Sequence, residues 1–253
     1  MSRGPHPGPR GEGGYTLLEL LLALAITTFI VAPTFLLFIT QNRSYTAQSE
    51  VITLHRDAQA GLDILTRDLR MIGYGVPTAA NRITAATSSS LTATGNFSSI
   101  STTLRASVAV AATSLPVNSV TGFAVGDTLY VTTTSASGTT TAETATVTAV
   151  TGGGSPALTV SAGLTNSYSA GADVHQNKTV TYTYDSSAQT VSRNTQVLLR
   201  NVTACTFTYD SGTLTAIRKI TVNLTVQTSR ALPEIGRPSV SLRTIVTPQN
   251  LAF

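Results

Sequence analysis

The side chains that could carry out chemistry in this 253-residue chain are few and scattered. Histidine occurs at His6, His55 and His175, and these positions are too far apart to give the ligand spacing of a metal site. Four acids of the second half stand singly at turns or strand edges, namely Asp127, Glu143, Asp173 and Asp185. No two of them have a spacing that suggests general acid–base catalysis.

Nucleophiles and phosphate-binding loops are missing as well. Cys205 is the single cysteine, so the chain has neither an internal disulfide nor a thiolate zinc site, and its place on an apolar strand face predicts a buried thiol. No serine lies in a G-x-S-x-G motif. Gly152–Gly154 lacks the lysine and the following helix of a phosphate-binding loop. The sequence therefore predicts a protein that is not an enzyme and has no cofactor and no bound metal.

The one ionisable side chain in an unusual place is Glu19, the only charge in the 25 residues Tyr15–Ile39. A helix of this length spans roughly 37 Å, which is enough to cross a bilayer core of about 30 Å. A secretory signal peptide would place its small residues after the apolar run, whereas Gly13 and Gly14 precede it. A plain membrane anchor explains the length equally well, but it does not explain an acid inside the apolar run.

An acid within a membrane segment marks a functional position and needs a partner. If the bond between Gly14 and Tyr15 is cleaved, the new α-amine of Tyr15 lies at the same end of the helix as Glu19. We therefore expect the amine of a neighbouring copy to pair with Glu19.

These residues carry a family resemblance. The sequence G-Y-T-L-L-E-L at Gly14–Leu20 resembles the leader junction of type IV prepilins and type II secretion pseudopilins. The resemblance implies cleavage after Gly14 by a prepilin peptidase, N-methylation of Tyr15, and subunit docking by Glu19. The family usually has Phe at the first mature position, so Tyr15 is a mild departure.

Beyond Ile39 the sequence becomes polar but keeps a helical period. One apolar stripe consists of Val51, Leu54, Ala58, Leu62, Leu65, Leu69 and Ile72. Gly73, Gly75 and Pro77 should end this helix at about Ile72, and Pro33 should kink its apolar half. The segment Arg67–Gly75 resembles the helix end of PilW-type minor pilins, and less closely that of pseudopilin J of type II secretion.

From Thr78 onward the pattern is that of an antiparallel sheet. Predicted strands are Val180–Tyr184, Val191–Leu199, Val202–Tyr209, Ile217–Gln227 and Ser239–Thr247. The spans Thr183–Asp185, Asn201–Asp210 and Ser241–Asn250 again resemble the PilW family, although Gln249–Asn250 stands where that family more often has Arg-Asn.

The middle of the chain, 104–178, reads as a small all-β module, a barrel or a sandwich inserted between strands of the head. It is similar to β modules repeated in phage tail and bacterial surface proteins. The alternative is a Thr/Ser/Ala linker or a disordered loop, and the regular apolar alternation favours a folded module.

The fold class expected is α+β and pilin-like, with a long kinked N-terminal helix packed on an antiparallel β-sheet head that carries an inserted all-β module. The expected divisions are a leader peptide (1–14), a transmembrane helix half (15–40), an amphipathic helix half (41–76), the start of the head (77–103), the insert (104–178) and the C-terminal sheet (179–253).

Charge gives little support to a nucleic-acid partner. Charged residues make up 11% of the chain and the net charge is +4. A basic face that could touch DNA would draw on cations of the last third, among them Arg193, Arg200, Arg218, Lys219 and Arg230. They are not interleaved with aromatic residues, so a solvated surface is the simpler interpretation.

The sequence and the resemblance together predict a minor pilin of a type IV pilus that helps to initiate or cap assembly at the tip. The expected partners are the major pilin and other minor pilins, prepilin peptidase, the inner-membrane assembly platform and a tip adhesin. The chain should cross the inner membrane once, with a cytoplasmic N-terminus and a periplasmic head, before it reaches the pilus. Two alternatives remain: a J-like type II secretion pseudopilin, and a DNA-binding minor pilin for competence.

Overall fold

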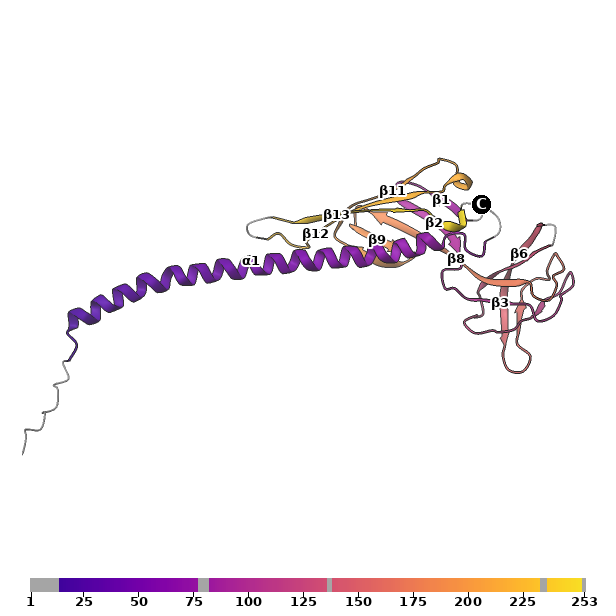
Figure 1. Ribbon diagram of the computed structural model, residues 1–253, viewed down its shortest axis with the longest axis horizontal. Coiled ribbons are helices and arrows are strands. Elements are labelled where there is room, and N and C mark those ends of the chain that lie inside the picture. The colour runs from indigo at the N-terminus through magenta and orange to yellow at the C-terminus, as the bar shows by residue number, and fades with distance from the viewer. Residues whose placement is uncertain (1–13, 77–81, 136–137, 233–235, 252–253) are drawn as a thin grey trace, which may run out of the picture. The chain divides into compact units, whose positions relative to one another are not determined.

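A single long helix opens the protein. The computed structural model describes residues 14–76, 82–135, 138–232 and 236–251. Helix α1 (Leu17–Met71) has 55 residues and ends where Gly73 and Gly75 adopt left-handed backbone conformations, with φ of 78° and 71° (Figure 1). The helix continues through Pro33. The expected kink at this residue stays a prediction.

The chain divides into two units, residues 1–50 and 51–253, and α1 has a different character in each. In the first unit the large apolar side chains of α1 from Leu17 to Phe38 are exposed. In the second unit one face is buried, and the buried positions are Ala58, Gly61, Leu65, Asp68 and Leu69. This spacing of three and four residues confirms the amphipathic stripe expected from the sequence.

Two antiparallel sheets pack with the buried face of α1. The first has the order β1 (Ile83–Ala86), β2 (Ser90–Gly95), β8 (Asp173–Asp185), β9 (Thr190–Arg193) and β10 (Gln196–Arg200). The second has the order β11 (Val202–Tyr209), β12 (Ile220–Gln227) and β13 (Ser239–Val246).

One hydrophobic core joins these parts. It includes Leu65 and Leu69 of α1, Val180 of β8, and Phe207 and Val222 of the second sheet. Along β12 the expected alternation is confirmed, because its apolar residues are buried while two of the three intervening polar residues are only half-buried. The fold is therefore α+β, a long helix followed by antiparallel sheets that share its core.

The middle of the chain forms a closed barrel around a second core. Its strands are β3 (Ser101–Thr103), β4 (Ser114–Pro116), β5 (Thr128–Thr134), β6 (Thr140–Thr151) and β7 (Ala157–Val160). Together with the first half of β8 they pair in the order β3-β8-β5-β6-β7-β4. A bridge between Leu104 and Val117, and a 3.0 Å hydrogen bond from Asn118 N to Thr103 O, connect β4 back to β3.

Residues of this barrel core run from Leu104 to Val174 and include the fully buried Leu115, Leu129 and Leu158. The described middle is thus folded, and β8 belongs to the barrel with its first half and to the first sheet with its second. The boundaries at 104 and 178 stay a prediction.

Several strand predictions need correction. Val191–Leu199 is not one strand but the hairpin β9–β10, because Asn194 takes a left-handed conformation (φ 54°) in the turn. Strand β12 starts at Ile220 rather than Ile217, since the 3-10 turn η2 (Leu214–Ala216) precedes it. Strand β8 is longer than Val180–Tyr184, and a second 3-10 turn, η3 (Gln249–Leu251), follows β13.

Candidate functional site

The start of α1 is built by a reciprocal pair of hydrogen bonds between Thr16 and Glu19. The Glu19 backbone N–H donates to the Thr16 hydroxyl oxygen at 3.2 Å, and the Glu19 Oε2 accepts from the Thr16 backbone N–H at 2.9 Å. The Thr16 hydroxyl also lies 3.1 Å from the same Oε2. This is a capping box, which satisfies two backbone donors that the first turn of a helix otherwise leaves unpaired.

Glu19 therefore has a partner within its own chain, which the sequence interpretation missed. The signal was present, because Thr16–Glu19 reads T-x-x-E directly at the start of the apolar run. The cap uses the amide of Thr16 and not the amine of residue 15, so it is compatible with cleavage before Tyr15. Pairing between Glu19 and a neighbour's amine stays a prediction.

The expected cleavage position lies in open surroundings. Tyr15 is 92% exposed, and a Cβ placed on Gly14 would meet no atom within 4 Å. Residues 1–13 of the expected leader lie outside the described residues. Gly14 and Tyr15 thus lie directly before the helix and Glu19 lies in its first turn, whereas Pro33 lies almost four turns beyond Glu19.

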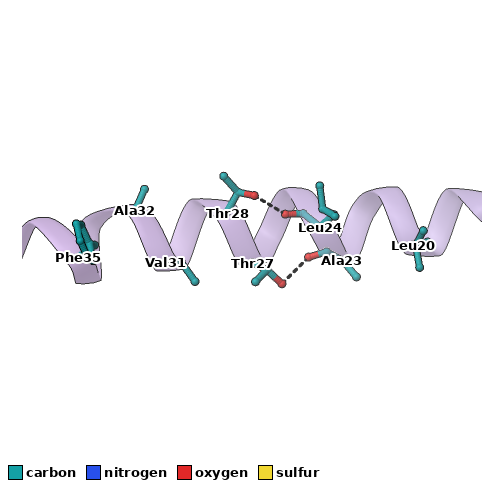
Figure 2. A pocket seen from close by; sticks show the side chains of 8 residues that line it. All are labelled: Leu20, Ala23, Leu24, Thr27, Thr28, Val31, Ala32 and Phe35. Carbon is teal, nitrogen blue, oxygen red and sulfur yellow. Dashed lines mark hydrogen bonds between the residues drawn. The ribbon is translucent and has the colours of Figure 1, made fainter.

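The first unit carries bare apolar surface. Large apolar side chains from Leu17 to Phe38 are exposed, and the helix is long and apolar enough to cross a membrane. Its threonines are compatible with this surface, because Thr27 donates its hydroxyl to the carbonyl of Ala23 at 2.7 Å and Thr28 donates to Leu24 at 2.8 Å (Figure 2). Each hydroxyl is satisfied inside the helix, so only methyl groups need to meet lipid or another helix.

A shallow apolar groove runs along this part of α1. Figure 2 shows the side chains that line it, which are Leu20, Ala23, Leu24, Thr27, Thr28, Val31, Ala32 and Phe35. Small residues in the middle and large ones at either end leave a hollow that fits apolar side chains or lipid tails.

A second polar cluster lies on the buried face of the helix. Asp68 is only 2% exposed, and its Oδ2 accepts hydrogen bonds from the Tyr182 hydroxyl at 2.7 Å and from the Arg193 Nε at 2.6 Å. Burial and then the hydrogen bond to Asp68 raise the pKa of the Tyr182 hydroxyl. This cluster links α1 to β8 and β9 and has a positioning role.

Three of the four acids singled out from the sequence, Asp127, Glu143 and Asp185, accept hydrogen bonds that hold the local structure. Asp127 accepts from Gln176 Nε2 at 2.6 Å and Asp185 caps the turn after β8 through the amide of Ser187 at 2.8 Å. Glu143 Oε2 accepts from the Thr165 amide at 2.7 Å. Within the described ranges no three His, Cys, Asp or Glu side chains gather as a metal site would require.

No protein-family model matches the chain, and neither a curated protein nor a solved structure matches it.

Proposed function

We propose that the chain is a minor pilin of a type IV pilus that helps to initiate or cap assembly at the filament tip. One observation carries the proposal: the junction Gly14–Tyr15 stands directly before the Thr16–Glu19 capping box, which opens a long helix with a bare apolar first half. Prepilin peptidase cleaves this junction, Tyr15 becomes N-methylated, and the protein is not an enzyme.

The apolar half of α1 lies first in the lipid bilayer and later among other pilin helices. It first holds the subunit in the inner membrane, with the head in the periplasm, and then enters a bundle of similar helices in the filament. The groove shown in Figure 2 receives side chains of a neighbouring pilin helix. Apolar surface stays out of water in both environments, so extraction does not lose the hydrophobic free energy of burial.

Glu19 can act in assembly through its charge or through the helix cap, and substitution separates the two. Gln at the third helical position still completes a capping box but carries no charge. We expect Glu19→Gln to insert and be processed normally and to incorporate into filaments as poorly as Glu19→Ala. Thr16→Ala weakens the cap and keeps the charge, so it should incorporate better than either variant.

Normal incorporation of both Glu19 variants would remove Glu19 from docking. Normal incorporation of Glu19→Gln with loss in Thr16→Ala would assign the role to the cap. For the leader, Gly14→Glu should block processing, and a mature mass identical to that of the wild type would refute the cleavage position.

Deleting the gene tests whether the subunit works in a type IV pilus or in a type II secretion system. Sheared surface pili and secreted proteins are quantified in the same cultures, with the complemented strain as the control. Loss of pili with intact secretion supports the proposal. Intact pili with trapped secretion substrates would assign the chain to a type II secretion machine as a J-like pseudopilin.

A further inference from the structure

A groove of about 480 Å³ lies between the second half of α1 and strand β10. Residues of α1 between Leu54 and Ile64 form one wall, and Val197–Arg200 of β10 forms the other. Both walls belong to the unit of residues 51–253. The groove is distinct from the apolar groove on the first half of the helix, so the contact proposed for that half does not fill it.

The wall formed by β10 is an edge of the first sheet. Leu199 is buried in the core and Arg200 is exposed, as expected for successive residues of a strand, yet both line the groove. The groove therefore runs along the backbone of β10. One edge of this strand pairs with β9, and among the described residues no strand pairs with the other edge. Backbone N–H and C=O groups on that edge are a template for a further strand, which the bulge between Val197 and Leu199 limits to a short one.

Strand β10 runs opposite to the direction of α1 along this groove. Asp68, late in the helix, pairs with Arg193, which lies opposite Gln196 at the start of β10. Two turns earlier in the helix, Gly61 packs against Leu199 near the end of the strand. Later residues of the helix wall therefore lie beside the start of β10, and earlier residues lie beside its end.

This direction separates apolar from charged side chains. Toward one end of the groove lie Ile64, which is 41% exposed, and Val197, which is 42% exposed. Toward the other end lie Asp57 and Arg200, which are both exposed. Neither of these two forms an ion pair within the ranges that the structure describes. The groove thus presents two uncovered apolar side chains and two unpaired charges beside an open strand edge.

We propose that the groove binds an extended segment of a partner protein, which adds a short strand to the open edge of β10. The backbone of this segment pairs with β10, an apolar side chain covers Ile64 and Val197, and a polar side chain lies beside Asp57 and Arg200. A helix fits this site less well, because its backbone groups are already paired internally. A second copy of β10 also fits less well, since antiparallel pairing about a two-fold axis would set the charge of Arg200 against Val197. The proposal does not depend on the assignment to a pilus.

The test measures the binding of fluorescent peptides to the full chain in detergent micelles by fluorescence anisotropy. Three short probes alternate threonine with valine, isoleucine or leucine. We expect saturable binding of at least one probe, with a Kd of about 0.1–1 mM. Two versions of that probe carry N-methyl groups on alternate amides, one version for each side of the strand. Their affinities should differ at least about tenfold, because only one side of the probe pairs with β10. An alanine-rich helical peptide of equal hydrophobicity is the control and should not bind.

Variants of the chain locate the site. Val197→Glu and Ile64→Glu should each weaken binding at least about tenfold, because both set a charge against the apolar side chain of the probe. Val125→Glu changes a valine of the barrel that is 67% exposed and should leave the affinity unchanged. Circular dichroism checks that each variant keeps the fold. Saturable binding that is weakened in both groove variants and kept in Val125→Glu supports the proposal.

Other results would overturn the proposal. They are no saturable binding of any probe, equal affinity of the two N-methylated probes, binding of the helical peptide as tight as that of the probe, and unchanged affinity in both groove variants. Sedimentation of the chain without a probe adds one more, because self-association that Val197→Glu abolishes would assign the groove to a second copy.

Discussion

The guanidinium of Arg193 and the carboxylate of Asp68 form an ion pair, 2.6 Å from Nε to Oδ2, across 125 residues of sequence. The hydroxyl of Tyr182 donates to the same oxygen at 2.7 Å. Asp68 is the acid that α1 buries in the head, so its charge depends on these two partners for compensation. The pair fixes the rotation of the helix on β8 and β9, because a turn of the helix about its axis would move Asp68 away from both donors.

Removing this carboxylate should destabilise the head. Asp68→Ala leaves a half-buried guanidinium and a buried hydroxyl without their acceptor, and we expect the free energy of unfolding to fall by about 2–3 kcal/mol after allowance for the partial exposure of Arg193. Asp68→Asn, which keeps an oxygen acceptor, should lose less. Urea unfolding of the purified protein in micelles measures both. Asp63→Ala changes an exposed acid on the same helix and should stay within about 0.5 kcal/mol of the wild type.

Close packing at Gly61 should make this position sensitive to a single methyl group. A Cβ there would lie 2.6 Å from Cγ and Cδ2 of Leu199 on β10, which is too close for carbon atoms. Alanine favours a helix by about 1 kcal/mol over glycine, but overpacking costs typically about 1–3 kcal/mol, so we expect a net loss of stability in Gly61→Ala.

The double variant Gly61→Ala/Leu199→Ala tests the cause, because its loss should be smaller than the sum of the two single losses. Gly212→Ala is the control, since nothing lies within 4 Å of a Cβ at Gly212. Additive losses in the double variant would show that Leu199 is not the obstacle.

Glu143 should make the barrel sensitive to acid. Burial acts to raise its pKa, but hydrogen bonds from Thr165 and Asn166 outweigh burial and hold the pKa below the ordinary value of 4.5. Its contribution to stability is therefore complete above the ordinary value and is lost as the pH falls through the lower pKa of the folded state. Glu143→Gln should be less stable than the wild type at pH 7, and the difference should shrink as the pH falls below 4.5.

The measurement is urea unfolding at a series of pH values. Asp57→Asn, which changes an exposed acid of α1, provides the comparison for general acid effects. A difference between Glu143→Gln and wild type that stays constant down to pH 3 would contradict the assignment of the hydrogen bonds to an ionised carboxylate.

The reactivity of the Cys205 thiol should show whether the hydrophobic core shared by α1 and the two sheets stays closed. Burial alone raises the pKa of its thiol to about 12, so almost no thiolate forms at pH 8. We expect the folded protein to resist a disulfide reagent at pH 8 and to react once per chain in denaturant. Ser187→Cys, in the exposed turn after β8, should add one thiol that reacts immediately. Rapid labelling of Cys205 without denaturant would show that the core opens readily.

The sequence predicts features that depend on a short local pattern better than features that depend on contacts between distant residues. The stripe on α1, the alternation along β12 and the inert setting of Cys205 depend on period and polarity, and the sequence predicts all three. The capping box of Thr16 and Glu19 is also a local pattern, T-x-x-E, but the apolar run around Glu19 favours an interpretation by charge alone.

Other features depend on contacts that no local pattern contains. The partners of Asp68 are 114 and 125 residues away, and on the helix alone this residue looks like one more solvated charge. The closure of the barrel depends on Leu104 meeting Val117, and a cavity lined by His175 draws on five separate segments. The break at Asn194 was hidden because Val191–Leu199 is apolar enough to read as one continuous strand.

The pairing of Gly95 with Lys178 has a consequence for how this chain can vary. These residues lie opposite each other on β2 and β8, so the polypeptide leaves the first sheet and returns to it at one place. Everything between them occupies the position of a hairpin turn. A short loop, or a different domain with closely spaced ends, can therefore replace the barrel without changing the register of the remaining strands. The barrel can therefore be exchanged as a unit, and the amino acids on its surface can change independently of those in the helix and sheets that carry it.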